Sequence, residues 1–171
     1  KMKELVFALL EYSRLNLSKQ EKTLVDLNEV MKEVQNKYAK EIEASSIKIY
    51  SDELPAVMAD KKQMLQLLNG LFDNAVKFRN PAAPEIRIQA KKLTGKWEIS
   101  IRDNGMGIDP LFFEKIFIIF RKLNNDEIKY PGCGAGLTAC KKIVELHEGT
   151  IWLESEVEKG STFYFTLPDL L

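Results

Sequence analysis

The sequence predicts an α+β protein in which helices cover one face of a sheet, as in a two-layer sandwich. Over most of the first 80 residues, apolar residues repeat every three to four positions, which is the spacing of amphipathic helices. In the stretches 85–103 and 150–167 they alternate singly, as in half-buried strands. The length of 171 residues corresponds to one domain with a short appended segment.

The chain opens with an amphipathic helical pattern that no capping residue precedes. A helix of about 15 residues with one apolar stripe is marginal alone in water. We therefore interpret residues 1–18 as the end of a longer helix that pairs with another helix, and residues 19–171 as a separate domain. A helix packed on its own domain is the alternative. The stripe consists of Met2, Leu5, Val6, Leu9 and Leu10.

Two further helices and two short strands are predicted before residue 81. Asp26 and Asp60 are residues of the kind that cap helix N-termini, and each precedes a helical apolar pattern. The second of these helices is expected to end near Pro81, because proline cannot continue a helix. Between the helices, 47–50 alternates as a short strand, and 54–58 is predicted to be extended.

The second half of the chain alternates between strands and helices. A Thr-Gly pair at 94–95 is typical of a hairpin turn between two strands. A turn around Gly160 separates two more strands near the C-terminus. The predicted elements are strands at 85–93 and 96–103, a short helix at 112–116, a helix at 135–147, and strands at 150–155 and 161–167.

Charge balance and short apolar runs exclude several classes of protein. The chain carries 25 Lys and Arg against 25 Asp and Glu, which argues against a nucleic-acid partner. No apolar run approaches the roughly 20 residues of a membrane-spanning helix, and residues 1–4 do not open a signal peptide. Two cysteines and one histidine provide neither a disulfide framework nor a usual zinc site. We expect a cytoplasmic chain without membrane contact.

The run Asp-Asn-Gly-Met-Gly at 103–107 follows a predicted strand. A carboxylate at a strand end can accept a hydrogen bond from the exocyclic amine of adenine, whereas guanine presents an oxygen there. The glycines at 105 and 107 would let the backbone approach a flat ring or a phosphate closely. An ordinary Asx turn after a strand is the alternative.

A second glycine-rich run, at 132–137, leads into the predicted helix at 135–147. Glycines at a helix N-terminus expose backbone N–H groups, and the helix dipole favours an anion at the same place. The run therefore indicates a phosphate site. A flexible loop that merely ends at a helix is the alternative.

Asn74, Lys77 and Phe78 share one face of the third predicted helix, because they are spaced at i, i+3 and i+4. An amide oxygen can bind Mg²⁺, a lysine can neutralise a phosphate, and an aromatic ring can flank a base. The alternative is a solvated helix edge with Phe78 in the core.

Together these runs resemble the catalytic domain of sensor histidine kinases. Its fold is shared with the gyrase, heat-shock chaperone and mismatch-repair ATPases. The resemblance covers about residues 24–168, and the segments 78–81, 130–132 and 140–144 are most similar to the phytochrome-like, PAS-linked branch. The runs at 73–78, 103–108, 113–123, 132–137 and 160–163 are similar to the family's N box, first glycine box, F box, second glycine box and closing strand.

The resemblance implies the Bergerat ATP-binding fold, a mixed, mostly antiparallel sheet of about five strands covered on one face by three helices. Residues 1–18 then resemble the tail of the second helix of the dimerisation and phosphoacceptor hairpin. The domain at 19–171 would bind ATP and Mg²⁺.

The resemblance also implies roles for individual residues. Asp103 would read the adenine amine with Thr162 assisting, and Asn74 would hold Mg²⁺. Lys77 and Arg121 would contact phosphates, the latter from a mobile lid at 117–132. The catalytic set would be Asn74, Lys77 and Arg121, and the cofactor-binding set Asn74, Lys77, Phe78, Asp103, Gly105, Gly107, Ile108, Tyr130, Gly132, Gly134, Gly136, Leu137 and Thr162.

The implied function is a protein histidine kinase of a two-component system. It would transfer the γ-phosphoryl group of ATP to a histidine on the dimerisation hairpin of its own parent kinase, for relay to an aspartate of a response-regulator receiver domain. The parent is expected to be a homodimer. One alternative is a degenerate, non-catalytic nucleotide-binding signalling module; another is a free-standing ATPase or serine kinase of the same fold.

Two residues bear on the implied phosphoryl transfer. Gly70 stands four residues before Asn74, where relatives usually have a second asparagine, so the rate of phosphoryl transfer is open. His147, the single histidine, lies at a predicted helix end, and we interpret it as a structural residue and not as the phosphoacceptor.

Overall fold

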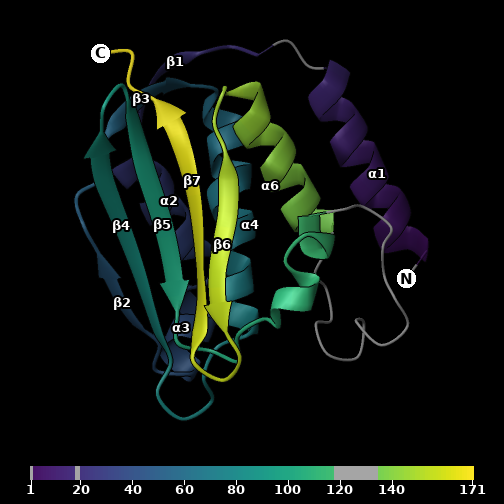
Figure 1. Ribbon diagram of the computed structural model, residues 1–171, viewed down its shortest axis with the longest axis vertical. Helices are drawn as coiled ribbons and strands as arrows, with labels where there is room; N and C mark the ends of the chain where they lie inside the picture. Colours follow the sequence, from purple (N-terminus) through teal and green to yellow (C-terminus); the bar gives the residue numbers. More distant parts are fainter. Residues whose placement is uncertain (1, 18–19, 118–134) are drawn as a thin grey trace.

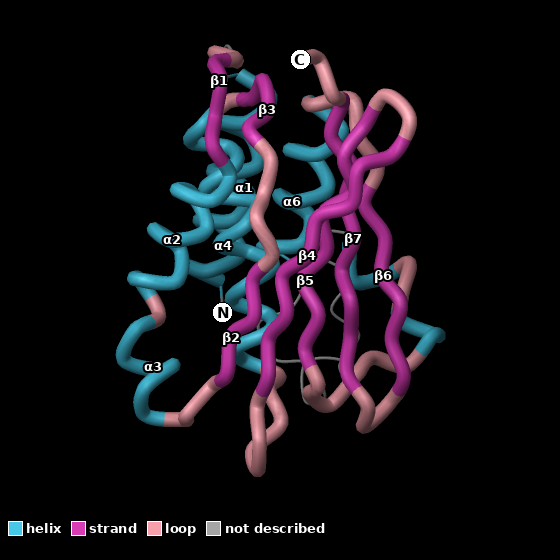
Figure 2. Tube along the Cα trace, turned by 90° about the vertical axis from the view of Figure 1, so that its left-hand side faces the viewer, coloured by secondary structure: helices cyan, strands magenta, loops and turns pink. Residues whose placement is uncertain are grey.

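The computed structural model describes residues 2–17, 20–117 and 135–171. They form two layers, a sheet and a group of helices on one of its faces (Figure 1). Figure 2 shows the two layers edge-on, with the helices on one side and the strands of the larger sheet on the other. The predicted α+β sandwich is confirmed.

The sheet has five strands in the order β2-β4-β5-β7-β6. β2 pairs with β4 in parallel, and the other neighbours are antiparallel, so the expected mixed, mostly antiparallel sheet is confirmed. Gly95 makes the turn between β4 and β5 with a φ of 73°. The strands are β2 (Lys48–Ser51), β4 (Glu85–Leu93), β5 (Lys96–Asp103), β6 (Ile151–Glu156) and β7 (Gly160–Pro168).

Three helices cover one face of this sheet: α2 (Leu27–Lys37), α4 (Lys61–Lys77) and α6 (Ala135–Leu146). The predicted caps are confirmed, because the Asp26 side chain accepts from Asn28 N and that of Asp60 accepts from Gln63 N. α4 ends at Lys77, a few residues before the predicted end. The backbone at Phe78 leaves helical geometry well ahead of Pro81.

Several short elements differ from the predictions. β1 (Thr23–Asp26) was not expected, and it pairs with β3 (Ala56–Ala59) as a separate antiparallel ribbon. The second helical pattern divides at Tyr38 into α2 and α3 (Ala39–Ala44). The expected short helix at 112–116 consists of two 3-10 turns, η1 (Pro110–Phe112) and η2 (Lys115–Phe117).

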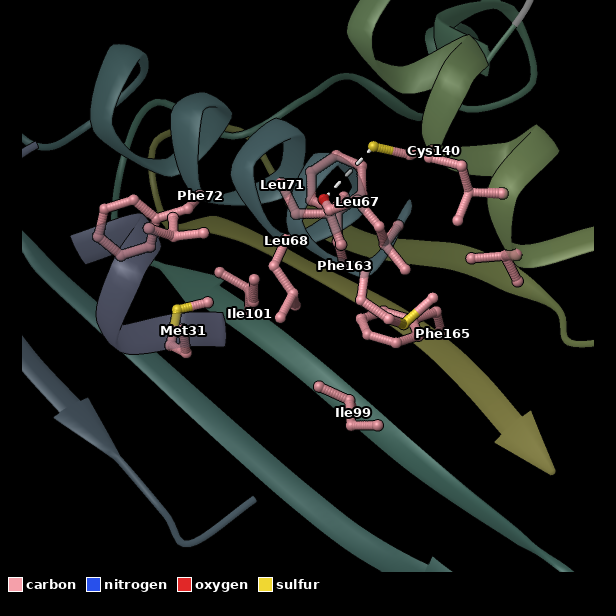
Figure 3. Close-up of a cluster of buried hydrophobic side chains, with 14 of the residues drawn as sticks. Met31, Leu67, Leu68, Leu71, Phe72, Ile99, Ile101, Cys140, Phe163 and Phe165 are labelled. Carbon is pink, nitrogen blue, oxygen red and sulfur yellow. Dashed lines mark hydrogen bonds between the residues drawn. The ribbon is translucent and has the colours of Figure 1, made fainter. Parts of the chain in front are cut away.

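The core lies between α4 and the middle of the sheet (Figure 3). Alternate residues of β5 and β7 point toward the helices, as the period of two requires. Each large apolar side chain buried in this way contributes about 1.5–3 kcal/mol. The fully or almost fully buried residues here are Met31, Leu67, Leu68, Leu71, Phe72, Ile99, Ile101, Phe163 and Phe165.

His147 joins the C-terminal end of α6 to the start of α4. Its Nε2 accepts from the backbone N–H of Asp60 at 3.1 Å, so Nδ1 carries the proton and donates to the carbonyl of Ile143 at 2.8 Å. The residue is 2% exposed, and burial lowers its pKa. A buried, neutral imidazole with both nitrogens bonded is a structural residue, as interpreted from the sequence. α4 and α6 therefore run antiparallel.

The N-terminal helix α1 (Met2–Leu17) packs beside α6 (Figure 1). Leu15 is buried there, whereas Val6, Phe7, Leu9 and Leu10 are exposed. The pairing of this helix with another one stays a prediction. None of the described helices combines the length and the apolarity that crossing a bilayer would require.

Candidate functional site

Asp103 is the last residue of β5, and its carboxylate is buried at the end of the sheet. Its side chain lies on the helix-covered face, because it alternates with Ile99 and Ile101. It is 5% exposed and accepts hydrogen bonds from the backbone N–H groups of Gly105, at 2.9 Å, and Ser161.

Burial dominates the electrostatics of Asp103. It raises the pKa of the carboxyl from 3.8 to about 6, and the two backbone hydrogen bonds only partly oppose this. Among the described residues, no cation forms an ion pair with it. Keeping a carboxylate out of water without a counter-ion is unfavourable, and such groups are typical of functional sites.

Gly105 and Gly107 follow Asp103 in a loop that is wedged between two other segments. A Cβ at Gly105 would lie 1.8 Å from the carbonyl oxygen of Phe78, and one at Gly107 would lie 2.1 Å from that of Glu156. Gly107 also has a φ of 71°, which favours glycine. The structure thus explains both glycines by contacts within the protein. The predicted approach of a ring or phosphate to them stays a prediction.

Asn74 lies on α4 beside the N-terminal end of α6. It is 8% exposed and lines a cavity of about 680 Å³, which Gly136 and Leu137 also line. The structure therefore brings together three predicted site residues, Asn74, Gly136 and Leu137. The exposed backbone at the start of α6 and an amide side chain face the same space, which suits a small anion with a bound cation.

Lys77, Phe78 and Ile108 lie near this end of the molecule but make other contacts. The ammonium of Lys77 lies 2.9 Å from Oδ2 of Asp73, and its side chain is 46% exposed. Phe78 packs partly against the core, and its carbonyl accepts from Met106 N. Ile108 is buried, and its N–H donates to Ser155 Oγ at 2.7 Å. The ligand contacts expected of all three stay predictions.

The structure does not place Thr162 beside Asp103. Ser161 is paired with Asp103 in the register of β5 and β7, whereas Thr162 is paired with Arg102. Because side chains alternate along a strand, Thr162 lies on the face away from the helices, where it hydrogen-bonds Tyr164. The expectation that Thr162 assists Asp103 is wrong by one residue, because Ser161 lies there instead. The alternation of Ser161, Phe163 and Phe165 on one face of the strand was the signal that could have located Ser161.

The remaining predicted site residues, Arg121, Tyr130, Gly132 and Gly134, lie outside the described residues. The sequence also gave no role to Tyr38 and Asp73, although the structure joins both to Lys77. The i, i+4 spacing of Asp73 and Lys77 was the available signal for that pair.

Gly70 lies at a close contact between α4 and α6. A Cβ at Gly70 would lie 2.7 Å from Sγ of Cys140 and 3.6 Å from the carbonyl oxygen of Gly136. Cys140 is buried, burial raises the pKa of its thiol to about 12, and Sγ hydrogen-bonds the carbonyl of Leu67 (Figure 3). An asparagine at position 70 would therefore have to displace Cys140.

Comparison with known proteins identifies the family. Residues 59–171 match the family described as histidine kinase-, DNA gyrase B-, and HSP90-like ATPase. The chain belongs to this ATPase family. Within it, the chain is 41% identical over 167 residues to Cyanobacterial phytochrome A of Nostoc sp., and 40% identical over 141 residues to the adaptive-response sensory kinase SasA of Synechocystis sp..

These alignments include 98% and 82% of this chain, but only 22% and 36% of the respective relatives. The chain thus spans about a fifth to a third of the length of these curated ATPase-family relatives.

Solved histidine kinases have the same fold. The catalytic domain of ThkA superposes with a TM-score of 0.74 at 31% identity, covering 86% of this chain and 95% of that one. Full-length ShkA, determined in complex with AMPPNP, superposes with a TM-score of 0.81 at 25% identity, covering 96% of this chain and 35% of that one. The described part of the chain is therefore similar to the catalytic part of larger kinases.

Replacing Gly70 should destabilise the contact between α4 and α6. For Gly70→Ala, overpacking costs about 1–3 kcal/mol and better helix propensity returns about 1, so we expect a net loss on the order of 1 kcal/mol. Adding Cys140→Ala should recover much of that loss, because the clashing sulfur is gone. Thermal unfolding of the single and double variants measures both effects.

Gly136→Ala is the matched control, since a Cβ there meets no described atom within 4 Å. It should leave the unfolding temperature unchanged or raise it. The close contact would be contradicted if Gly70→Ala were as stable as the parent. It would also be contradicted if adding Cys140→Ala recovered none of the lost stability.

Neutralising Asp103 should stabilise the fold at neutral pH. The pKa of Asp103 is about 6 in the folded state, against 3.8 in the unfolded chain. Ionisation of this carboxyl therefore lowers the free energy of unfolding, by at most about 3 kcal/mol once the pH is above 6. Asp103→Asn keeps an oxygen for the Gly105 N–H but carries no charge. We expect it to unfold at a higher temperature than the parent at pH 7.5, with the difference disappearing toward pH 4.

Asp52→Asn, at an exposed aspartate, controls for the loss of a charge and should show no comparable gain. If Asp103→Asn and the parent differ by the same amount at every pH, the burial of this carboxylate is not what sets its energetics.

Proposed function

We propose that this chain is the ATP-binding catalytic part of a sensor histidine kinase. The observation that carries the proposal is the buried carboxylate of Asp103 at the end of β5, which has no cationic partner in the described part of the chain, in a member of this ATPase family. Its parent would transfer the γ-phosphoryl group of ATP to a histidine on a dimerisation hairpin. An aspartate of a response-regulator receiver domain would then receive it.

Asp103 gives the site its preference for adenine. Ionised, the carboxylate only accepts hydrogen bonds, so it suits the exocyclic amine of adenine and opposes the oxygen that guanine has there. Its own backbone donors, Gly105 and Ser161, hold it in one orientation. Fixed donors and acceptors in a buried site discriminate strongly, because the wrong base leaves them unpaired.

The described residues fit a Mg²⁺ ion that nucleotide phosphates help to hold. Among them, no cluster of three or more His, Cys, Asp or Glu side chains could hold a metal ion. The amide oxygen of Asn74, in the cavity beside Gly136, is the protein ligand that we assign to the ion. Mg²⁺ in such sites typically takes one or two protein ligands besides phosphate oxygens and water, and it neutralises charge during transfer.

This chain's own residues would mainly position the reactants, because phosphoryl transfer needs little covalent chemistry from the protein. Asp103 fixes the base, and the backbone N–H groups at the start of α6 face the phosphates. Lys77, and Arg121 from the proposed lid, would neutralise charge that develops on them. Phe78, Gly105, Gly107, Ile108, Leu137 and the backbone at Tyr130, Gly132, Gly134 and Gly136 would line the nucleotide.

The partners are inferred from relatives. ShkA was determined with AMPPNP, and ThkA was determined in complex with the response regulator TrrA, at a TM-score of 0.77 and 29% identity to this chain. A receiver domain is thus the proposed downstream partner. The exposed stripe on α1, which comprises Val6, Phe7, Leu9 and Leu10, supports a hairpin that forms a homodimer. We place that hairpin in a cytoplasmic part of the parent.

A fusion tests the transfer. The hairpin of Cyanobacterial phytochrome A is joined to residue 1 in the register of the alignment and incubated with γ-labelled ATP and Mg²⁺. We expect acid-labile label on the hairpin histidine. Asn74→Ala should slow labelling on the order of 100-fold, because the metal loses its protein ligand. Asn36→Ala, at an exposed position of α2, is the matched control and should leave the rate of labelling unchanged.

The outcomes separate the candidates. Saturable ATP binding without label would contradict the kinase and favour a non-catalytic nucleotide-binding module, for which the glycine at position 70 is the specific observation. Absence of any ATP binding would contradict both.

A further inference from the structure

Tyr38 links α2 and α3 to the face of α4 that carries Lys77. It occupies the junction between these two helices, and its ring packs against Phe72 with the centroids 5.4 Å apart. Its hydroxyl donates to Oδ1 of Asp73 at 2.9 Å. The other oxygen of the same carboxylate, Oδ2, lies 2.9 Å from Nζ of Lys77. The three side chains thus form one chain of hydrogen bonds that ends at the ammonium.

The hydroxyl of Tyr38 is itself held from a second side. The side chain of Asn69, one turn before Asp73 on α4, hydrogen-bonds it. Burial and the hydrogen bond to Asp73 raise the pKa of Tyr38 above its ordinary value, so it remains a donor at any physiological pH. Turning the Asp73 carboxylate away from Tyr38 therefore breaks the hydrogen bond between them.

This restraint matters because Lys77 is half exposed on a long, flexible stem. An exposed ion pair between lysine and a carboxylate is weak alone, partly because holding both side chains in one geometry costs entropy. Tyr38 has already restricted Asp73, so less freedom is lost when the ammonium binds. Lysine has three N–H donors, and Asp73 uses one of them, which leaves two for another anion.

We propose that Tyr38 and Asp73 are positioning residues that hold the ammonium of Lys77 for a nucleotide phosphate. The inference rests on the proposed function, since it needs a phosphate beside Lys77. Tyr38 and Asp73 act through Lys77 and do not touch the nucleotide. In the opposite arrangement, Asp73 would withdraw Lys77 from the phosphates, and Asp73→Asn would then tighten ATP binding.

A double-mutant cycle in calorimetry tests the proposal. ATP and adenosine are titrated, with Mg²⁺, into the parent chain, Tyr38→Phe, Lys77→Ala and the double variant. Tyr38→Phe removes only the hydroxyl, and we expect it to weaken ATP binding about 2- to 5-fold. Adenosine, which has no phosphate, should bind the parent and Tyr38→Phe equally. In the Lys77→Ala background, Tyr38→Phe should have no further effect on ATP.

The chain offers a matched control in Tyr164, whose hydroxyl also donates to a carboxylate oxygen, that of Glu154, at 3.3 Å on the other face of the sheet. Tyr164→Phe should leave ATP affinity unchanged in both backgrounds. Asp73→Asn should weaken ATP binding as Tyr38→Phe does, and should also lose its effect when Lys77 is absent.

Two results would overturn the inference while leaving the proposed function intact. One is equal weakening by Tyr38→Phe with and without Lys77, which would mean that the hydroxyl only supports the fold. The other is tighter ATP binding by Asp73→Asn, which would mean that Asp73 competes with phosphate. A parent chain that binds no ATP at all would overturn the proposed function and, with it, this inference.

Discussion

The candidate site depends on one carboxylate, that of Asp103, which the fold keeps out of water at the end of β5. Backbone N–H groups from Gly105 and Ser161 stabilise it, and both come from segments that must pass very close to other backbone. Gly105 fits against the end of α4, and Gly107 fits against the β6–β7 hairpin. The loop at 104–107, the C-terminal end of α4 and the start of β7 are thus arranged around one charged group. Its burial costs stability, and a ligand that donates to it would recover part of that cost.

The contact between α4 and α6 brings the second half of the site to the same end of the molecule. His147 ties the last turn of α6 to the first residues of α4, and Gly70 lets the helices approach at Cys140. Because the helices run antiparallel, Asn74 then lies beside the start of α6. Position 70 therefore has a packing role in this chain, since a side chain there would lie against Cys140.

The sequence predicted the elements whose signals are local, and missed those set by distant contacts. Asp26 and Asp60 were identified as caps because a cap depends on the next three residues. β1 was missed because a four-residue strand is defined by its partner β3, 30 residues away along the chain. Thr162 was chosen in place of Ser161 because one residue of register separates the two faces of a strand. Neither the Gly70–Cys140 contact nor the bond from Tyr38 to Asp73 follows from spacing alone.

The central claim, that Asp103 selects adenine, is tested most directly by calorimetric titration of the parent chain with ATP and with GTP in the presence of Mg²⁺. The two ligands share their phosphates and differ in the hydrogen-bonding edge of the base. We predict that ATP binds at least about 100-fold more tightly than GTP, as expected when a buried acceptor meets an oxygen in place of an amine. Equal affinities for the two nucleotides would contradict the account.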